Sequence, residues 1–163
     1  DVIALCETAA GIVNATAIAA VDAVVGLMWG AEDLVASLGG SSSRREDGRY
    51  RDVAAHARSA VLLAAGAHRK AAVDSVFVDI PDLDGLAAEA ADAAAVGFTA
   101  TACIHPDQVA TIRAAYAPSP EELAFARELL AAAEHERGVF TFRGRMVDEP
   151  VLVHARKVLA RAV

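Results

Sequence analysis

Short apolar runs alternate with alanine-rich stretches along the first two thirds of the chain. The apolar runs predict β-strands at residues 2–6, 23–29, 71–79 and 98–104. The stretches between them predict helices at about residues 9–20, 50–67 and 82–96. Because a helix between two strands returns the chain to the same end of a sheet, this order is typical of parallel sheets. The pattern therefore predicts an α/β fold with four parallel strands.

The last third of the chain predicts helices joined by turns. Residues 105–117 are predicted to form the first of these helices. Ser119 and Glu122 have the spacing of a capping box, which predicts a helix over residues 120–137. After it we expect a short extended segment at 139–142, a turn at Gly144 and a final helix over 150–162.

Four strands with their helices amount to half of an eight-stranded parallel barrel, and such a half would leave both sheet edges open. The residues leave three alternatives: the other half of a barrel is missing from this chain, a second copy supplies it, or the sheet is an open α/β fold. The chain starts with Asp1 rather than Met, next to a predicted strand. We therefore expect the protein to continue upstream of Asp1.

Composition and charge narrow the class of protein. The 163 residues are 55% hydrophobic and carry a net charge of −7. A chain this apolar is not disordered, and its negative charge argues against binding to nucleic acid or to a membrane surface. No uninterrupted apolar run reaches the ~18 residues of a membrane span. The two cysteines, Cys6 and Cys103, are too few for a disulfide scaffold, so we expect a reducing cytoplasm.

Acidic residues follow the first two predicted strands. Ligands of parallel α/β proteins bind at the carboxyl ends of the strands, where Glu7 and Asp33 lie. Neighbouring strands are about 4.8 Å apart, so these two carboxylates can share one small cation. Oxygen ligands suit Mg²⁺ or Mn²⁺. A simpler interpretation also fits, with Glu7 as a polar strand end and Asp33 as a helix cap.

Other polar residues favour structural roles. Residues 39–50 (GGSSSRREDGRY) predict a mobile surface loop, whose arginines are poor candidates for binding a substrate. Asp74 and Asp79 are expected either to order the mouth of a barrel or to cap the following turn. A solvated helix face is predicted for the acidic series Asp82, Asp84, Glu89 and Asp92.

Five short motifs stand in order along the chain: CET at 6–8, GAEDL at 30–34, AVDSVFVD at 72–79, IHPDQ at 104–108 and GRMVD at 144–148. Together they resemble the citrate lyase β-subunit-like proteins of the HpcH/HpaI aldolase and malyl-CoA lyase superfamily. The resemblance covers essentially the whole chain but only the C-terminal half of the family's barrel. It implies a TIM (β/α)₈-barrel, with strands five to eight in residues 1–117 and a C-terminal helical extension in residues 118–163. It also implies a homo-oligomer, either a trimer or a hexamer.

The resemblance assigns a metal and a substrate to the predicted strand ends. It implies that Glu7 and Asp33 bind Mg²⁺ and that this ion holds an α-keto or α-hydroxy carboxylate. The backbone amides of Gly30, Ala31 and Glu32 would face the substrate carboxylate at a helix N-terminus. An arginine that holds the same carboxylate in the family belongs to the first half of the barrel.

Two further segments are implied to contact a CoA ester. The backbone of Ala102 and Cys103 would lie beside the thioester arm of CoA. Asp148 matches an aspartate that reaches the active site of a neighbouring subunit as a general acid or base. Asp148 is also suited to cap the helix that Pro150 opens, and both roles can hold at once.

The function that this resemblance implies is that of a Mg²⁺-dependent carbon–carbon lyase. Its substrate would be a β-hydroxyacyl-CoA such as malyl-, citramalyl- or citryl-CoA, which is cleaved to, or condensed from, an acyl-CoA and an α-keto acid. Two alternatives stay open: a CoA-independent metal aldolase of the same superfamily, and a non-catalytic partial-barrel subunit. We expect little or no turnover from this chain alone.

Overall fold

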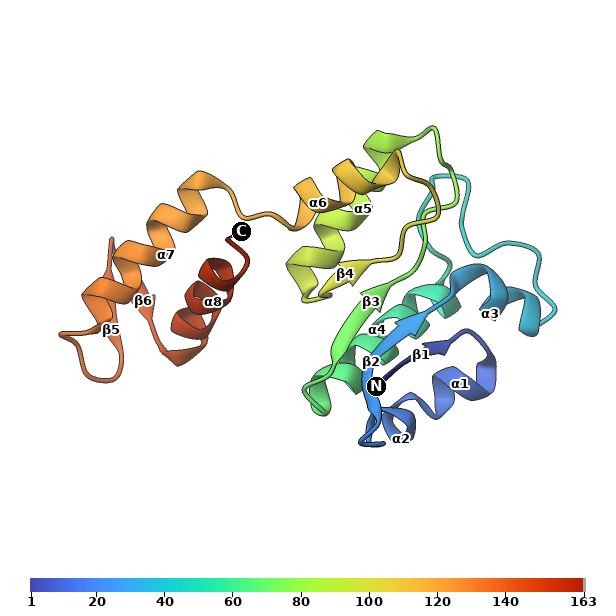
Figure 1. Ribbon diagram of the computed structural model, residues 1–163, viewed down its shortest axis with the longest axis horizontal. Coiled ribbons are helices and arrows are strands. Elements are labelled where there is room, and N and C mark those ends of the chain that lie inside the picture. Colours follow the sequence, from blue (N-terminus) through green and yellow to red (C-terminus); the bar gives the residue numbers. More distant parts are fainter. Residues whose placement is uncertain (163) are drawn as a thin grey trace. The chain divides into compact units, whose positions relative to one another are not determined.

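The chain divides into two compact units in the computed structural model, which describes residues 1–162 (Figure 1). Unit 1 is Asp1–Ala115 and unit 2 is Tyr116–Val163. The predicted boundary, between residues 117 and 118, lies close to this division. Within the described residues, no helix is both long enough and apolar enough to cross a membrane.

Unit 1 is built on a parallel sheet of four strands in sequence order. The strands are β1 (Val2–Cys6), β2 (Val24–Trp29), β3 (Ala71–Asp74) and β4 (Ala100–Thr101). Cys6 lies opposite Trp29, and Asp74 lies opposite Thr101, so the carboxyl ends of the paired strands line up. The predicted α/β fold with a parallel sheet is confirmed.

Helices follow each strand of unit 1. They are α1 (Ala9–Val13), α2 (Ala15–Ala19), α3 (Ala31–Ser37), α4 (Asp52–Ala67), α5 (Leu83–Val96) and α6 (Gln108–Tyr116). The single helix predicted at 9–20 is interrupted at Asn14, whose side-chain amide donates to the carbonyl of Ala10. Figure 1 shows α4 running along the sheet beside β2 and β3.

Two strands are shorter than the apolar runs that predicted them. β3 ends at Asp74 because the amide of Ser75 donates to the Asp74 carboxylate at 3.0 Å instead of continuing the ladder. β4 covers two residues of the predicted 98–104. Beyond it the side chain of Gln108 accepts from the amide of Ile104 at 3.2 Å, which replaces a strand hydrogen bond.

Small side chains bring α4 close to the sheet. Its buried face consists of Ala54, Ala57, Val61, Ala64 and Ala65, which recur at helical spacing. The edge strand β1 differs, because Ile3 and Leu5, two residues apart and so on one face, are 56% and 48% exposed. Unit 1 therefore has a well-packed helical side and exposed apolar residues along its first strand.

Unit 2 contains α7 (Pro120–Ala133), β5 (Phe140–Phe142), β6 (Arg145–Val147) and α8 (Glu149–Ala160). The predicted capping box is confirmed, since Ser119 Oγ accepts from the Glu122 amide and the Glu122 carboxylate accepts from the Ser119 amide. β5 and β6 form an antiparallel hairpin with Gly144 in its turn at φ 76°. The helix α7 ends at Ala133, earlier than the predicted residue 137.

Candidate functional site

Glu7 and Asp33 converge beside Gly30. Glu7 directly follows β1, and Asp33 lies in the first turn of α3, which follows the neighbouring strand β2. A methyl group on the Cα of Gly30 would lie 3.0 Å from Glu7 Oε2 and 3.8 Å from Asp33 Oδ2. Both carboxylates therefore border one small space, which is open because residue 30 has no side chain.

The residues around this space fit a hard divalent cation. Within residues 1–162, neither Glu7 nor Asp33 forms an ion pair with a basic side chain. Mg²⁺ is commonly bound by one or two carboxylates and takes its other oxygen ligands from water and substrate. Nowhere in the described part of the chain do three or more His, Cys, Asp or Glu side chains form a metal cluster. A cation held by Glu7 and Asp33 would therefore depend on water and substrate for its remaining ligands.

The turn between β2 and α3 is held by hydroxyl groups from two distant segments. The amide of Ala31 donates to Ser75 Oγ at 3.2 Å, and Ser43 Oγ donates to Glu32 Oε1 at 2.5 Å. The Ala31 amide is thus occupied by the protein itself, although the family resemblance directs it toward a substrate carboxylate. Substrate binding by Gly30, Ala31 and Glu32 stays a prediction.

Asp74, at the end of β3, is neutralised by the protein. It is 1% exposed, and its carboxylate accepts from Arg58 Nε at 2.9 Å and Nη2 at 2.7 Å. It also accepts from the indole Nε1 of Trp29 at 2.6 Å. Burial lowers the pKa of Arg58, but hydrogen bonds to Asp74 and Asp92 outweigh burial and raise this pKa above its ordinary value. Asp74 therefore orders the strand end through an ion pair.

Side-chain hydrogen bonds hold the segment 39–50 against the rest of unit 1, whereas its polar composition predicts a mobile loop. Arg44 donates to both carboxylate oxygens of Glu89, at 2.7 and 2.9 Å, and its guanidinium lies 4.0 Å from the centre of the Tyr50 ring. The Tyr50 hydroxyl also donates to Glu89, and burial together with the Glu89 charge raises the pKa of Tyr50. Glu89 is 16% exposed, so the prediction of a solvated helix face is wrong for this residue.

Gln108 joins the segments that follow β3 and β4. Its side chain is completely buried, donates to the carbonyl of Phe77 at 2.9 Å and accepts from the amide of Ile104 at 3.2 Å. The amide of Ala102 donates to the carbonyl of Asp74 at 3.0 Å. Gln108 therefore fixes the segment that contains Ala102 and the exposed Cys103. The sequence patterns did not identify Gln108 as a functional residue. The feature that could have identified it is an amide side chain at the end of the IHPDQ motif, where the following helix faces the core.

Asp148 caps α8 in unit 2. Its side chain accepts from the amide of Val151 at 3.4 Å, and Pro150 lies just inside the helix. The cap interpretation is therefore confirmed. The second role of Asp148, at the active site of a neighbouring subunit, stays a prediction.

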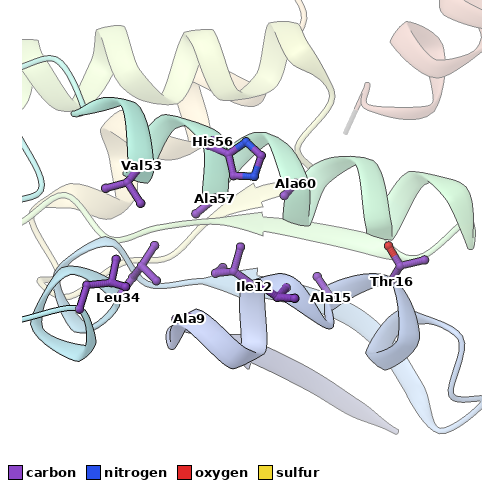
Figure 2. Close-up of a pocket in the computed structure, with 11 residues that line it drawn as sticks. Ala9, Ile12, Ala15, Thr16, Leu34, Val53, His56, Ala57 and Ala60 are labelled. Carbon is purple, nitrogen blue, oxygen red and sulfur yellow. The ribbon is translucent and has the colours of Figure 1, made fainter.

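A cavity of about 410 Å³ lies between α1, α2, α3 and α4. Figure 2 shows Ile12, Leu34 and Val53 around it, with His56 on α4. Its lining contains no acidic residue, so this cavity is unsuited to a divalent cation, unlike the space beside Gly30.

A parallel α/β sheet with two carboxylates at neighbouring strand ends is typical of α/β proteins that bind a ligand at the carboxyl edge of the sheet. The model of the HpcH/HpaI aldolase/citrate lyase family matches residues 1–106. The chain therefore belongs to this family, as its motifs predict.

Similar proteins are longer than this chain. A citrate lyase subunit beta-like protein of Mycobacterium tuberculosis is 62% identical over 162 residues, which cover 99% of this chain and 59% of that protein. The mitochondrial citramalyl-CoA lyase of Mus musculus is 37% identical over 179 residues, with 99% and 50% covered. The crystal structure of CitE from M. tuberculosis with magnesium, acetoacetate and coenzyme A matches with a TM-score of 0.92 at 62% identity, with 99% and 61% covered. The chain thus spans 50% to 59% of the length of these curated relatives.

Proposed function

We propose that this chain is the C-terminal half of a (β/α)₈ barrel whose complete protein is a Mg²⁺-dependent carbon–carbon lyase. The substrate is a β-hydroxyacyl-CoA such as malyl-, citramalyl- or citryl-CoA. The observation that carries the proposal is the convergence of Glu7 and Asp33 on the space beside Gly30. The similarity to a structure that contains magnesium, acetoacetate and coenzyme A supports the choice of metal, keto acid and CoA ester.

Glu7 and Asp33 are the residues that would hold Mg²⁺. When bound there, the ion would polarise a hydroxyl or keto oxygen and neutralise negative charge on the substrate. Gly30 keeps the space between the carboxylates open, because any larger residue would place its Cβ 3.0 Å from Glu7. Gly30, Ala31 and Glu32 flank the substrate carboxylate, and the backbone of Ala102 and Cys103 lies beside the CoA thioester.

In cleavage the substrate hydroxyl gives its proton to water, the O–H electron pair becomes the second bond of the new keto group, and the carbon–carbon bond breaks. The electron pair of that bond moves onto the α-carbon of the acyl-CoA, and this carbon takes up a proton. Asp148 of a neighbouring subunit supplies this proton, and in condensation it removes one from the same carbon. This role requires a homo-oligomer, which we propose to be a trimer or a hexamer.

The test uses the complete protein that contains this chain. The wild type with Mg²⁺ should convert malyl-CoA or citramalyl-CoA to acetyl-CoA and an α-keto acid, and Glu7→Gln should abolish both this reaction and the binding of Mn²⁺. Release of free CoA thiol without acetyl-CoA would indicate thioester hydrolysis. Cleavage of a CoA-free hydroxy acid would indicate the alternative aldolase. A Glu7→Gln variant with wild-type affinity for Mn²⁺ would overturn the proposed metal site.

A further inference from the structure

The end of β3 contacts the residues on both sides of Gly30. Trp29 Nε1 donates to Asp74 Oδ1 at 2.6 Å, and the amide of Ala31 donates to Ser75 Oγ at 3.2 Å. Asp74 and Ser75 are each 1% exposed, so water does not compete for these bonds. Gly30 is thus held from one side by a neighbouring strand end.

Asp74 itself is held in one orientation. Its carboxylate accepts from Arg58 at 2.7 and 2.9 Å and from the amide of Ser75 at 3.0 Å, in addition to Trp29. Arg58 is in turn paired with Asp92 of α5 at 2.6 Å. A carboxylate with this many donors has no alternative rotamer of similar energy, so it fixes Trp29 and the following residue in place.

The position of Gly30 sets the geometry of the two carboxylates. A Cβ at residue 30 would already touch Glu7 at 3.0 Å, so the turn and Glu7 are packed closely. The helix α3 starts at Ala31, and Asp33 follows two residues later on its first turn. A shift of Ala31 therefore moves Asp33 relative to Glu7.

We propose that Ser75, supported by Asp74, is a positioning residue that holds the β2–α3 turn so that Glu7 and Asp33 face one cation. The proposal rests on the proposed function, because it needs that cation. Ser75 acts through the amide of Ala31, and within residues 1–162 it forms no hydrogen bond with either carboxylate. A purely structural role would lower stability alone, whereas a positioning role also weakens metal binding.

The test compares Ser75→Ala with Thr99→Val in the complete protein. Thr99 Oγ1 donates to the carbonyl of Ala72 at 2.8 Å, so Thr99→Val removes one hydrogen bond from the same sheet away from the turn. Mn²⁺ affinity is measured by isothermal titration calorimetry, and folding is checked by circular dichroism. We expect Ser75→Ala to weaken Mn²⁺ binding about tenfold to a hundredfold. Thr99→Val should bind like the wild type.

A second measurement does not need the metal. Without Mn²⁺, hydrogen exchange at the amide of Ala31 should be faster in Ser75→Ala than in Thr99→Val, since its acceptor is gone. If Ser75→Ala does not fold, Trp29→Phe removes the indole donor to Asp74 but keeps a ring, and the same weakening of Mn²⁺ binding is expected.

The outcomes separate the two proposals. Wild-type Mn²⁺ affinity in a folded Ser75→Ala, or in Trp29→Phe if Ser75→Ala does not fold, would overturn the positioning role and leave the lyase proposal intact. Failure of the wild type to bind Mn²⁺ would overturn the metal site and the positioning role together. Loss of affinity in Ser75→Ala and Thr99→Val alike would show a general effect of stability, which also contradicts the positioning role.

Discussion

The ends of β1 and β2 and the end of β3 carry acidic side chains in two different electrostatic states. Within residues 1–162, Glu7 and Asp33 have no basic partner, whereas Asp74 is paired with Arg58 at 2.7 Å. A carboxylate that already has a guanidinium partner would lose that pair on binding a metal ion. Two unpaired carboxylates around one space repel each other until a cation binds. The partners of an acidic residue, rather than its place at a strand end, therefore separate a candidate metal ligand from a structural acid.

The two regions are nevertheless connected. Asp74 and Ser75 hold Trp29 and Ala31, the residues next to Gly30. The buried, neutralised Asp74 thereby supports the geometry of Glu7 and Asp33. Substitutions at either of these strand ends therefore test this difference in roles.

The largest effect is expected for Asp33→Asn. Removing one of two anionic ligands should weaken Mn²⁺ binding by about a hundredfold or more and abolish turnover. The measurement is calorimetry on the complete protein, with Asp52→Asn as the control. Asp52 is an exposed acid paired with Arg45, and its loss should leave Mn²⁺ affinity unchanged. Equal affinities of the two variants would remove the distinction between unpaired and paired acids.

Asp148 is a further acidic residue in this comparison, and its partner is a backbone amide. Asparagine caps a helix as well as aspartate does, so Asp148→Asn should keep the stability of α8. It cannot transfer a proton, so kcat should fall by about 10²- to 10⁴-fold. Steady-state kinetics and thermal unfolding check both effects. Wild-type kcat in Asp148→Asn would restrict this residue to its role as a cap.

Arg58→Ala tests the paired side of the comparison. It leaves Asp74 buried without its cation, which should lower the free energy of unfolding by about 3–5 kcal/mol. The control is Arg156→Ala in unit 2, where both partners of the ion pair with Glu149 are more than half exposed. That loss should be about 0–1 kcal/mol. Similar losses in urea unfolding of the two variants would contradict the importance assigned to burial.

The smallest effect is expected for Gln108→Leu. It leaves the carbonyl of Phe77 and the amide of Ile104 without their buried partner, at a cost of about 1–3 kcal/mol. Because Gln108 fixes the segment beside the proposed CoA arm, KM for the CoA ester should rise more than kcat falls. Asp107→Asn, a change at the adjacent exposed residue, is the control. A KM unchanged from that control would separate Gln108 from the substrate.

Much of the sheet could be predicted from the sequence, because apolar runs and alanine-rich helices record burial directly. The ends of β3 and β4 could not, since they depend on single hydrogen bonds that the side chains of Asp74 and Gln108 accept from backbone amides. Hydrophobic periodicity carries no information on such single side-chain contacts.

The candidate site, like the sheet, could be predicted only in part. Glu7 and Asp33 could be predicted because strand order alone brings neighbouring carboxyl ends together. Ser75 could not, because a serine after a strand is common and only the fold shows that it meets the amide of Ala31. The attachment of Arg44 to Glu89 was missed for the same reason, as 45 residues separate them in the sequence.

The central claim is that Glu7 and Asp33 hold one divalent cation beside Gly30. Anomalous diffraction from crystals of the complete protein soaked in Mn²⁺ tests it most directly. We expect one strong anomalous peak within bonding distance of a carboxylate oxygen from each residue. A peak elsewhere in the protein, with Glu7 and Asp33 bound to no metal, would contradict it.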